Sequence, residues 1–222
     1  SLGALPKDIM KIIVYGAGKT GIYTADSIRR DYPEHSIVGF VDDNPASAGP
    51  TPFPMLGLPE SYSKLQQDHG VDAMVLGFVL PVAQRLEKAK LLASKGVYFP
   101  SLCSDEVRNT WGVRIGNGVL IHKSSVITPG VTIDHFVGIN SGAHIEESTI
   151  GMGCIITPNV FIGEGSRIGQ GTIIYPNTPV LPKTTIGDHC VIGANEVVHA
   201  DIPSGARYFK GKVHKDILVT RI

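Results

Sequence analysis

The sequence predicts a two-part fold: an α/β region of Rossmann-like βαβ type, followed by a parallel β-helix. Three observations support this prediction. Aliphatic residues recur at every sixth position through the second half, turn-forming residues fill the intervals between them, and a glycine motif follows a buried strand near the N-terminus. A chain of 222 residues is long enough for one large domain or two modest ones, each with a sizeable core.

The second half of the chain carries a six-residue repeat. It begins at Ile115 and is broken only by a single step of five between Ile145 and Ile150. A period of six fits neither an α-helix nor an alternating strand, but it fits a triangular coil of short strands and corners. Each aliphatic side chain would then fill the axis of the coil. The repeated positions are Ile115, Ile121, Ile127, Ile133, Ile139, Ile145, Ile150, Ile156, Ile162, Ile168, Ile174, Val180, Ile186 and Ile192.

The residues between the aliphatic positions agree with this coil. The residue four positions after each aliphatic one is small or β-branched in most repeats. Turn formers stand between the repeats, as in Pro129-Gly130 and Pro176-Asn177. Three hexapeptides per turn predict roughly four to five coils in this part of the chain.

The first half begins with a nucleotide-binding pattern. Lys11–Tyr15 is predicted to be a buried strand, and Gly16, Gly18 and Gly21 follow it in a G-x-G-x-x-G motif. A helix with Ile22, Ala25 and Ile28 on one face comes next, and then a strand over 37–41 that ends at Asp42 and Asp43. In this context the motif typically binds phosphate through backbone N–H groups and the N-terminus of the helix. A glycine turn used only for close strand–helix packing is the alternative.

The remaining elements of the first half make up only part of a dinucleotide-binding fold. We expect a third strand over 71–78, a helix over 84–95 and a fourth strand over 96–99. No second mononucleotide-binding half follows, so a tightly held NAD is not expected. A nucleotide that is attached to another group fits the pattern better.

Composition excludes several partners. Lys plus Arg and Asp plus Glu both number 20, so no net charge attracts nucleic acid or an anionic membrane. The chain has no run of 18 apolar residues and no charged-then-apolar leader, which predicts a soluble, cytoplasmic protein. Three widely spaced cysteines suit a reducing compartment. Residues 1–9, before Met10, are either native or an expression remnant.

The repeat resembles that of the hexapeptide-repeat acyltransferases. The shared pattern is an aliphatic residue, then Gly, Ala, Glu or Asp, and a small residue four positions after the aliphatic one, from Val113 to Val198. This resemblance implies a left-handed coil and a homotrimer, with acyl-CoA bound between neighbouring prisms. A β-helix that serves only as a scaffold or binding rod is the alternative.

The combination of both halves resembles the NeuD/PglD family of sugar acetyltransferases, from Met10 to about Lys215. The resemblance implies a nucleotide-sugar-binding domain over 10–100 and a β-helix acyltransferase domain with a C-terminal tail over 101–222. It places Gly16, Gly18 and Gly21 near phosphate, and Asp42 or Asp43 near the base or ribose. Acetyl-CoA is the implied co-substrate, and the residues expected to bind it are Gly163, Lys183, Gly193, Ala194 and Lys210.

The catalytic positions depart from the family pattern. The family base is a histidine that follows Ile-Glu, and here Glu147 occupies that position in a repeat one residue short. A second family histidine matches Ile155, and the closing Gly-x-Pro-Ala-Lys becomes Lys210-Gly211-Lys212. His144, three residues before Glu147, is the nearest imidazole in the sequence. His144 and Glu147 are therefore the predicted catalytic residues, with His135 as the next candidate.

The missing histidine favours one chemistry over another. An amine with a pKa of about 8 is already partly neutral at pH 7, whereas a hydroxyl needs a positioned base. The sequence therefore predicts N-acetylation of a nucleotide-linked amino sugar in surface polysaccharide or glycan synthesis. The alternatives are a sugar or sialic-acid O-acetyltransferase and a catalytically silent nucleotide-sugar or acyl-CoA binding protein. The histidine spacing does not match the zinc set of γ-class carbonic anhydrases, which share the β-helix, so no metal is expected.

Overall fold

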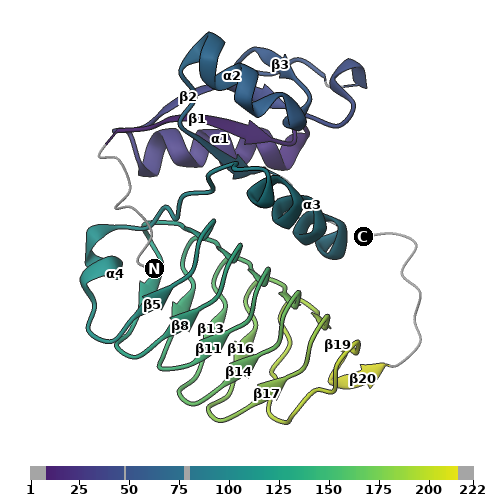
Figure 1. Cartoon of the computed structure of the whole chain (residues 1–222). Helices are drawn as coiled ribbons and strands as arrows, with labels where there is room; N and C mark the ends of the chain where they lie inside the picture. Colours follow the sequence, from purple (N-terminus) through teal and green to yellow (C-terminus); the bar gives the residue numbers. More distant parts are fainter. Residues whose placement is uncertain (1–8, 48, 78–80, 215–222) are drawn as a thin grey trace. The chain divides into compact units, whose positions relative to one another are not determined.

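The structure, a computed structural model, describes residues 9–47, 49–77 and 81–214. The chain forms two compact units, Ser1–Pro100 and Ser101–Ile222 (Figure 1). The first unit is an α/β structure and the second is a β-helix.

The α/β unit contains a parallel sheet with the strand order β3-β2-β1-β4. The strands expected at 11–15, 37–41 and 71–78 are confirmed, the last over a shorter stretch, and Phe78 lies outside the described residues. β1 is central, so its residues are buried from Ile12 to Tyr15. The strands are β1 (Lys11–Tyr15), β2 (Ser36–Val41), β3 (Met55–Gly57) and β4 (Ala73–Leu76).

The fourth strand expected over 96–99 is wrong. This segment forms no strand, although the N–H of Met74 donates to the carbonyl oxygen of Tyr98 at 2.9 Å. A single bond of this kind does not make a ladder, because a parallel pair needs a series of evenly spaced bonds. The fourth strand of the sheet is instead β3, which pairs with β2 at the other edge.

The helices of this unit bury their apolar faces. The helix expected after the glycine motif and the one expected over 84–95 are confirmed. Ala25 and Ile28 are buried as expected, while Ile22 is only partly buried. Ala25 packs with Val14 and Phe40 in a cluster between helix and sheet. The helices are α1 (Lys19–Asp31), α2 (Tyr62–His69) and α3 (Val82–Ser94), with one-turn 3-10 helices η1 (Pro45–Ser47) and η2 (Pro59–Ser61).

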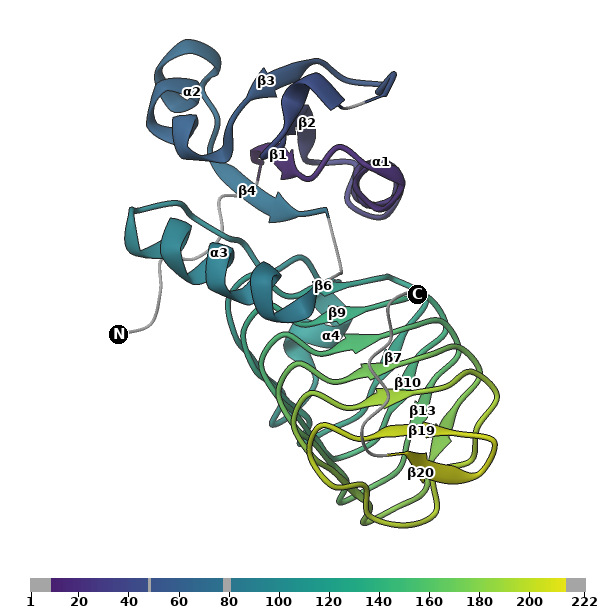
Figure 2. The same ribbon diagram turned by 90° about the vertical axis from the view of Figure 1, so that its right-hand side faces the viewer.

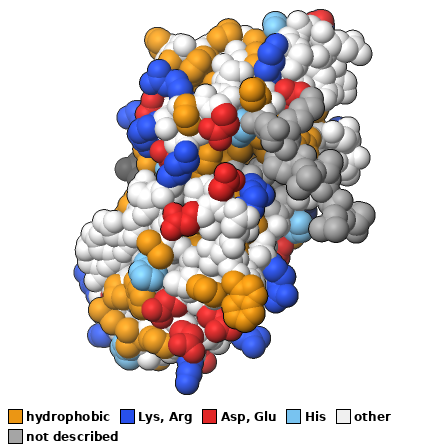
Figure 3. Space-filling view, turned by 90° about the vertical axis from the view of Figure 1, so that its left-hand side faces the viewer, with side chains coloured by type: hydrophobic (Ala, Val, Ile, Leu, Met, Phe, Trp, Pro, Cys, Tyr) orange, Lys and Arg blue, Asp and Glu red, His pale blue; other side chains and the backbone are white. Residues whose placement is uncertain are grey.

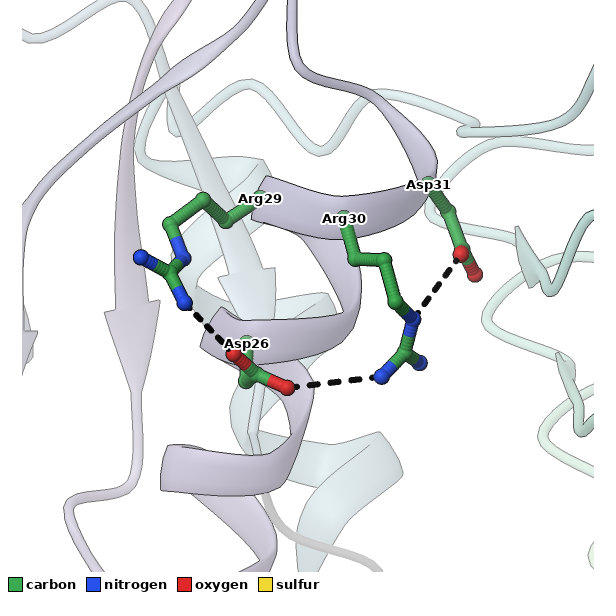
Figure 4. Close-up of polar contacts among 4 residues, drawn as sticks. All are labelled: Asp26, Arg29, Arg30 and Asp31. Atoms are coloured by element: carbon green, nitrogen blue, oxygen red, sulfur yellow. Dashed lines mark hydrogen bonds and ion pairs between the residues drawn. The ribbon is translucent and has the colours of Figure 1, made fainter.

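The outer surface of α1 carries a chain of ion pairs (Figure 4). Asp26 lies 3.0 Å from Arg29 and 3.4 Å from Arg30, and Arg30 also lies 3.4 Å from Asp31. Because Asp26 and both arginines are half exposed or more, each pair contributes only about 0.2–1 kcal/mol. Burial of the opposite face of α1 therefore holds this helix in place.

The second unit is a coil of two-residue strands stacked along one axis (Figures 1 and 2). Each strand from β5 to β15 pairs in parallel with the strand three positions later, so three strands make one turn, as the repeat predicts. The strands form three sheets, named here after the strands of one turn: the β10 sheet (β16-β13-β10-β7), the β11 sheet (β17-β14-β11-β8-β5) and the β12 sheet (β20-β19-β18-β15-β12-β9-β6).

A short helix, α4 (Asp105–Asn109), precedes the coil, and the hydroxyl of Ser104 caps it by accepting the N–H of Val107 at 3.3 Å. The strands are β5 (Arg114–Ile115), β6 (Leu120–Ile121), β7 (Val126–Ile127), β8 (Thr132–Ile133), β9 (Gly138–Ile139), β10 (His144–Ile145), β11 (Thr149–Ile150), β12 (Ile155–Ile156), β13 (Phe161–Ile162), β14 (Arg167–Ile168), β15 (Ile173–Ile174), β16 (Pro179–Val180), β17 (Thr185–Ile186), β18 (Val191–Ile192), β19 (Arg207–Phe209) and β20 (Lys212–His214).

The repeated isoleucines form the axial core of this coil. The thirteen members of the column from Ile121 to Ile192 are each at most 6% exposed. The first member, Ile115, is partly buried. Fully burying one such side chain contributes roughly 1.5–3 kcal/mol. The column therefore supplies most of the apolar burial of the β-helix.

Small polar residues four positions after an aliphatic one also point inward, and five of them make the same hydrogen bond. Their hydroxyl or thiol donates to the carbonyl oxygen fifteen residues later, at a corner of the next turn. Buried polar groups are tolerated when they are hydrogen-bonded in this way. The donors and acceptors are Ser125 and Asn140, Cys154 and Gly169, Ser166 and Leu181, Thr172 and Gly187, and Thr178 and Gly193.

One corner of the coil carries an asparagine ladder. Asn159, Asn177 and Asn195 stand above one another on successive turns, each with a φ near +60°. The side-chain amide of Asn159 donates to Asn177 at 3.1 Å, and that of Asn177 donates to Asn195 at 3.2 Å. Asparagine is the non-glycine residue that best tolerates this backbone conformation, so the ladder both shapes and links the corners.

The surface carries no extended field of one sign on the face drawn in Figure 3, where acidic and basic side chains are interspersed. None of the helices in the described ranges is long and apolar enough to cross a membrane. The three cysteines are free and buried, and burial raises the pKa of the Cys154 thiol to about 12.

The two residues of strand β14 provide a matched test of the axial core. We expect Ile168→Asp to destabilise the β-helix by about 3–5 kcal/mol, because the carboxylate would stand unpaired in the isoleucine column. Arg167→Asp puts the same charge on the outward, exposed residue of the same strand and should change stability by less than about 1 kcal/mol. Denaturant unfolding of both variants measures the difference, and equal midpoints would contradict a buried column.

Candidate functional site

The α/β unit has a cavity of about 250 Å³ at the carboxyl ends of its strands. Ligands of open α/β sheets typically bind at this edge. Gly16 and Gly18 of the glycine motif, the acidic pair and the first turn of α1 meet here. The lining residues are Tyr15, Gly16, Gly18, Lys19, Thr20, Asp42, Asp43, Gly77 and Gln84.

The three glycines of the motif have different tasks. Gly16 has a φ of +106°, and its N–H donates to the carbonyl oxygen of Val41 at 2.8 Å. A Cβ on Gly21 would overlap the carbonyl oxygen of Gly16, so Gly21 allows the helix to approach the strand. A Cβ on Gly18 would meet no atom within 4 Å. Gly16 and Gly21 therefore close the turn, and Gly18 leaves backbone open toward the cavity.

The start of α1 is electropositive and faces the cavity. Gly18 is the N-cap residue and supplies no side-chain acceptor, and the first turn contains no acidic residue. Lys19 and Thr20, which are both exposed, also line the cavity. The free N–H groups and the positive end of the helix dipole suit an anionic group at this point.

Asp42 supports the glycine turn. One carboxylate oxygen accepts the N–H of Ala17 at 2.8 Å, and the other accepts the N–H of Asn44 at 3.0 Å. Both oxygens are thus already engaged by backbone groups. Asp42 lines the cavity and also fixes the conformation of the loop that forms its wall.

Asp43 is held by two side chains from other elements. The hydroxyl of Tyr15 donates to one of its oxygens at 2.8 Å, and Lys88 of α3 forms an ion pair with the other. The Lys88 ammonium also lies 5.8 Å from the centre of the Tyr15 ring. Burial, followed by the bond to Asp43, raises the pKa of Tyr15 above its ordinary value, so the phenol stays protonated as a donor. Lys88, 45 residues from Asp43, was not anticipated from any local motif.

In the β-helix, His144 lies on the outer side of β10. It stands between Val126 and Phe161 on the neighbouring strands, and its ring meets that of Phe161 edge-on at a centroid distance of 5.7 Å. The residue is exposed. Within the described part of the chain no hydrogen bond or ion pair occupies its ring nitrogens, so both are accessible.

Glu147 lies at the corner that follows His144. It is exposed, and its side chain rests against Gly130, where an added Cβ would come within 2.9 Å of the Glu147 Cγ. Glu146 points elsewhere, because its carboxylate accepts the N–H of Glu164 at 3.0 Å. The structure therefore leaves His144 and Glu147 exposed on one strand and its following corner, while Glu146 links two turns of the coil.

The shortened repeat is absorbed at this same corner. Ser148 takes the inward position three residues after Ile145, instead of four, and its hydroxyl donates to the carbonyl oxygen of Glu146 at 2.6 Å. β11 then pairs in register with β8 and β14. The deletion thus changes the corner that carries Glu147 and leaves the sheets on either side intact.

His135 lies at a different corner and is already engaged. Its Nδ1 accepts the N–H of Asn117 at 2.8 Å. In that arrangement the neutral ring carries its proton on Nε2, which lies 3.8 Å from Asp134. Proton uptake at Nδ1 would break the bond to Asn117, so His135 is less suited to act as a base than His144.

The expected acetyl-CoA residues fall into two groups. Lys183, with a φ of +62°, stands two turns from Glu147 on the same corner, and its side chain crosses Gly165. Gly163 follows β13 and begins that corner. The second group is Gly193, Ala194 and Lys210 at the last turns, where the N–H of Lys210 donates to Glu196 at 2.6 Å. The structure does not bring the two groups together on one corner.

The described residues contain no group of three or more His, Cys, Asp or Glu side chains that could hold a metal ion.

Comparisons with known proteins identify the fold. Residues 165–199 match the family model described as bacterial transferase hexapeptide (six repeats). No curated protein sequence matches the chain. A histidine-to-asparagine mutant of perosamine N-acetyltransferase from Caulobacter crescentus, in complex with CoA and GDP-perosamine, superposes with a TM-score of 0.80 at 20% identity, covering 93% of this chain and 97% of that one.

A second solved structure gives a similar result. The acetyltransferase domain of PglB from Neisseria gonorrhoeae, in complex with acetyl coenzyme A, has a TM-score of 0.79 at 22% identity and covers 92% of this chain and 98% of that one. The predicted fold class, an α/β unit followed by a left-handed parallel β-helix, is confirmed by these likenesses.

The different tasks of the glycines can be tested by stability. In an ordinary helix, Gly→Ala is stabilising by about 0.5–1 kcal/mol. We expect Gly21→Ala to be destabilising by about 1–3 kcal/mol instead, because its Cβ would overlap Gly16. Gly18→Ala, with a φ of −74° and open space, should stay within about 1 kcal/mol of the parent. Thermal unfolding of both variants measures this, and a tolerated Gly21→Ala would contradict the close packing.

Proposed function

We propose that the protein is an acetyl-CoA-dependent N-acetyltransferase that acts on a nucleotide-linked amino sugar, in the synthesis of a surface polysaccharide or glycan. The observation that carries this proposal is the pairing, in one chain, of a glycine-motif cavity with a hexapeptide β-helix that exposes His144 and Glu147. The resemblance to the NeuD/PglD family and the likeness to structures that hold CoA with GDP-perosamine, or acetyl coenzyme A, support it.

The nucleotide part of the substrate is assigned to the cavity of the α/β unit. The diphosphate would lie at Gly16, Gly18 and the start of α1, where N–H groups and Lys19 face the cavity. Gly21 would act by closing the turn, and Asp42 and Asp43 would line the side toward the base and ribose. A cavity of about 250 Å³ is small for a complete sugar nucleotide, so the sugar would extend out of it.

Acetyl-CoA is assigned to the β-helix, with Gly163, Lys183, Gly193, Ala194 and Lys210 as its contacts in a homotrimer. Exposed apolar residues on and beside the β10 sheet support a neighbouring subunit: Val126 is 51%, Leu181 40% and Val197 51% exposed. Exposed apolar side chains on the face of the coil that carries His144 are typical of a surface that another subunit covers. Each acetyl-CoA would then lie between two prisms, with one group of contacts supplied by one subunit and the other group supplied by its neighbour. The cytoplasm is the proposed compartment, in agreement with three free thiols.

The reaction needs few groups from the protein. A base takes a proton from the sugar ammonium, and the neutral amine attacks the thioester carbonyl carbon. The tetrahedral intermediate then collapses with cleavage of the C–S bond, and the attacking nitrogen loses its second proton, which passes to the departing sulfur of CoA. His144 is the proposed base because its ring nitrogens are accessible and an imidazole accepts a proton more readily than a carboxylate. Glu147 is proposed to orient the ammonium or stabilise the protonated imidazole.

One observation favours a second function, a nucleotide-sugar or acyl-CoA binding protein without catalysis. Glu147 stands in the position of the family histidine. Release of the CoA thiol in the presence of acetyl-CoA and a nucleotide-linked amino sugar distinguishes the enzyme from the binder, and calorimetry with the two ligands detects the binder.

The nucleotide assignment predicts a selective defect. Gly18→Val should weaken binding of a nucleotide sugar about tenfold or more, because its branched side chain would fill the space at the start of α1. Affinity for acetyl-CoA should not change, because that ligand is assigned to the β-helix. Calorimetry with each ligand measures both. An equal loss of both ligands would indicate misfolding and would remove this support.

The base assignment predicts a pH-dependent defect. We expect His144→Gln to lower kcat about tenfold or more, with little change in KM, since a general base contributes about 10²–10⁴-fold. Glu147→Gln should have a similar but smaller effect. Both defects should shrink between pH 7 and 9, because a sugar amine with a pKa of about 8 loses its proton unaided over that range.

His135→Gln is the matched control for this prediction, since His135 lies at another corner and already accepts a hydrogen bond from Asn117. Its kcat should stay near that of the parent. Full activity of the His144 and Glu147 variants, together with loss in the His135 variant, would move the base to His135.

A further inference from the structure

The acidic side of the α/β cavity is closed by a cluster that the glycine motif does not explain. Asp43 follows β2, Tyr15 ends β1 and Lys88 lies at the middle of α3. The Tyr15 hydroxyl and the Lys88 ammonium each donate a hydrogen bond to one oxygen of the Asp43 carboxylate. Three elements thus converge on one carboxylate at the rim of the cavity.

The charges around the cavity are unevenly compensated. The two oxygens of Asp42 accept backbone N–H groups, and Asp43 is neutralised by Lys88 and held by Tyr15. Lys19 is exposed at the other end of the cavity, and no ion pair with an acidic side chain of the described residues holds it. With Lys88 in place, the charges of the cavity that have no counter-ion are therefore those of Lys19, the positive end of α1 and the Asp42 carboxylate, which only backbone N–H groups hold.

Removal of Lys88 would reverse this balance. The Asp43 carboxylate, whose side chain is 48% exposed, would keep the Tyr15 bond but lose its counter-ion. Its negative charge would then face any anion bound in the same small cavity. Repulsion between two like charges this close, near the surface of a protein, is strong enough to change an affinity by about tenfold or more.

We propose that Lys88 is a charge-compensating residue of the nucleotide cavity: it neutralises Asp43 so that the cavity accepts an anionic nucleoside diphosphate group. This inference rests on the proposed nucleotide site. It adds Lys88 as a positioning residue, and it names nucleoside diphosphates as the ligands whose binding depends on Lys88. Lys88 does not line the cavity, so it acts through Asp43 and not by touching the ligand.

Calorimetry with UDP and GDP on the full-length protein tests this role, with uridine and guanosine as uncharged probes. Lys88→Met should weaken the binding of the diphosphates about tenfold and leave that of the nucleosides nearly unchanged. Lys88→Arg should retain binding, because it keeps the charge. Lys90→Met is the matched control, since it removes one positive charge from an exposed position of the same helix.

The double variant Lys88→Met with Asp43→Asn is the decisive arm. If compensation is the role of Lys88, removing the carboxylate as well should restore most of the diphosphate affinity, so that Lys88→Met has little further effect when it is added to Asp43→Asn. A double variant as weak as Lys88→Met, or an equal loss of the uncharged nucleosides, would overturn the inference in favour of a structural role or direct ligand contact by Asp43. A parent protein that binds neither UDP nor GDP would refute the nucleotide site itself, whatever the Lys88 variants do.

Discussion

Burial of the isoleucine column fixes the geometry of the β-helix and, through it, the position of every outward residue. Each strand from β5 to β18 has only two residues, so one side chain enters the axis and the other must face outward. Hydrogen bonds of a two-residue strand are too few to set the register alone. The direction of His144 therefore depends on the burial of Ile145 beside it, and not on any contact of the imidazole itself.

The same constraint explains where a change of repeat length is tolerated. A missing residue within a strand would turn an isoleucine outward and an outward residue into the axis. The missing residue instead falls between Glu147 and Thr149, where Ser148 satisfies the inward position from a tighter corner. Thr149 and Ile150 resume their pairing on both sides. The corner of Glu147 can thus differ from those of other repeats at little cost to the core.

Much of the fold follows from the sequence because the signals are local and repeated. The isoleucine spacing alone gives the three-sided coil, and the glycine motif gives β1, α1 and β2. β3 and α2 were missed because a strand of three residues and a helix of eight are too short for a period to be recognised. The apolar residues of segment 96–99 predict a strand. Tertiary packing, however, decides which segment pairs at the edge of a sheet, and it cannot be read from the composition of the segment.

The sites are less predictable because they depend on partners far apart in the chain. The sequence places Asp42 and Asp43 beside the glycine motif, yet it does not distinguish them. Only the fold makes Asp42 a support of the loop and brings Lys88 to Asp43. Likewise, His135 and His144 look alike in the sequence, and the bond from Asn117 that engages one of them crosses a full turn of the coil.

These two cases share a physical cause, which is the need to satisfy polar groups wherever chain segments stack closely. At a corner of the coil, an N–H group that has no strand partner donates to a side-chain acceptor on an adjacent turn: His135 for Asn117, Glu146 for Glu164 and Asp188 for Gln170. A side chain recruited in this way is no longer available for chemistry. His144 lies within a strand, where the backbone groups already pair with β7 and β13, so its imidazole carries no such obligation. Position within the coil, more than residue type, therefore separates the histidine whose ring nitrogens are open from the one whose ring joins two turns.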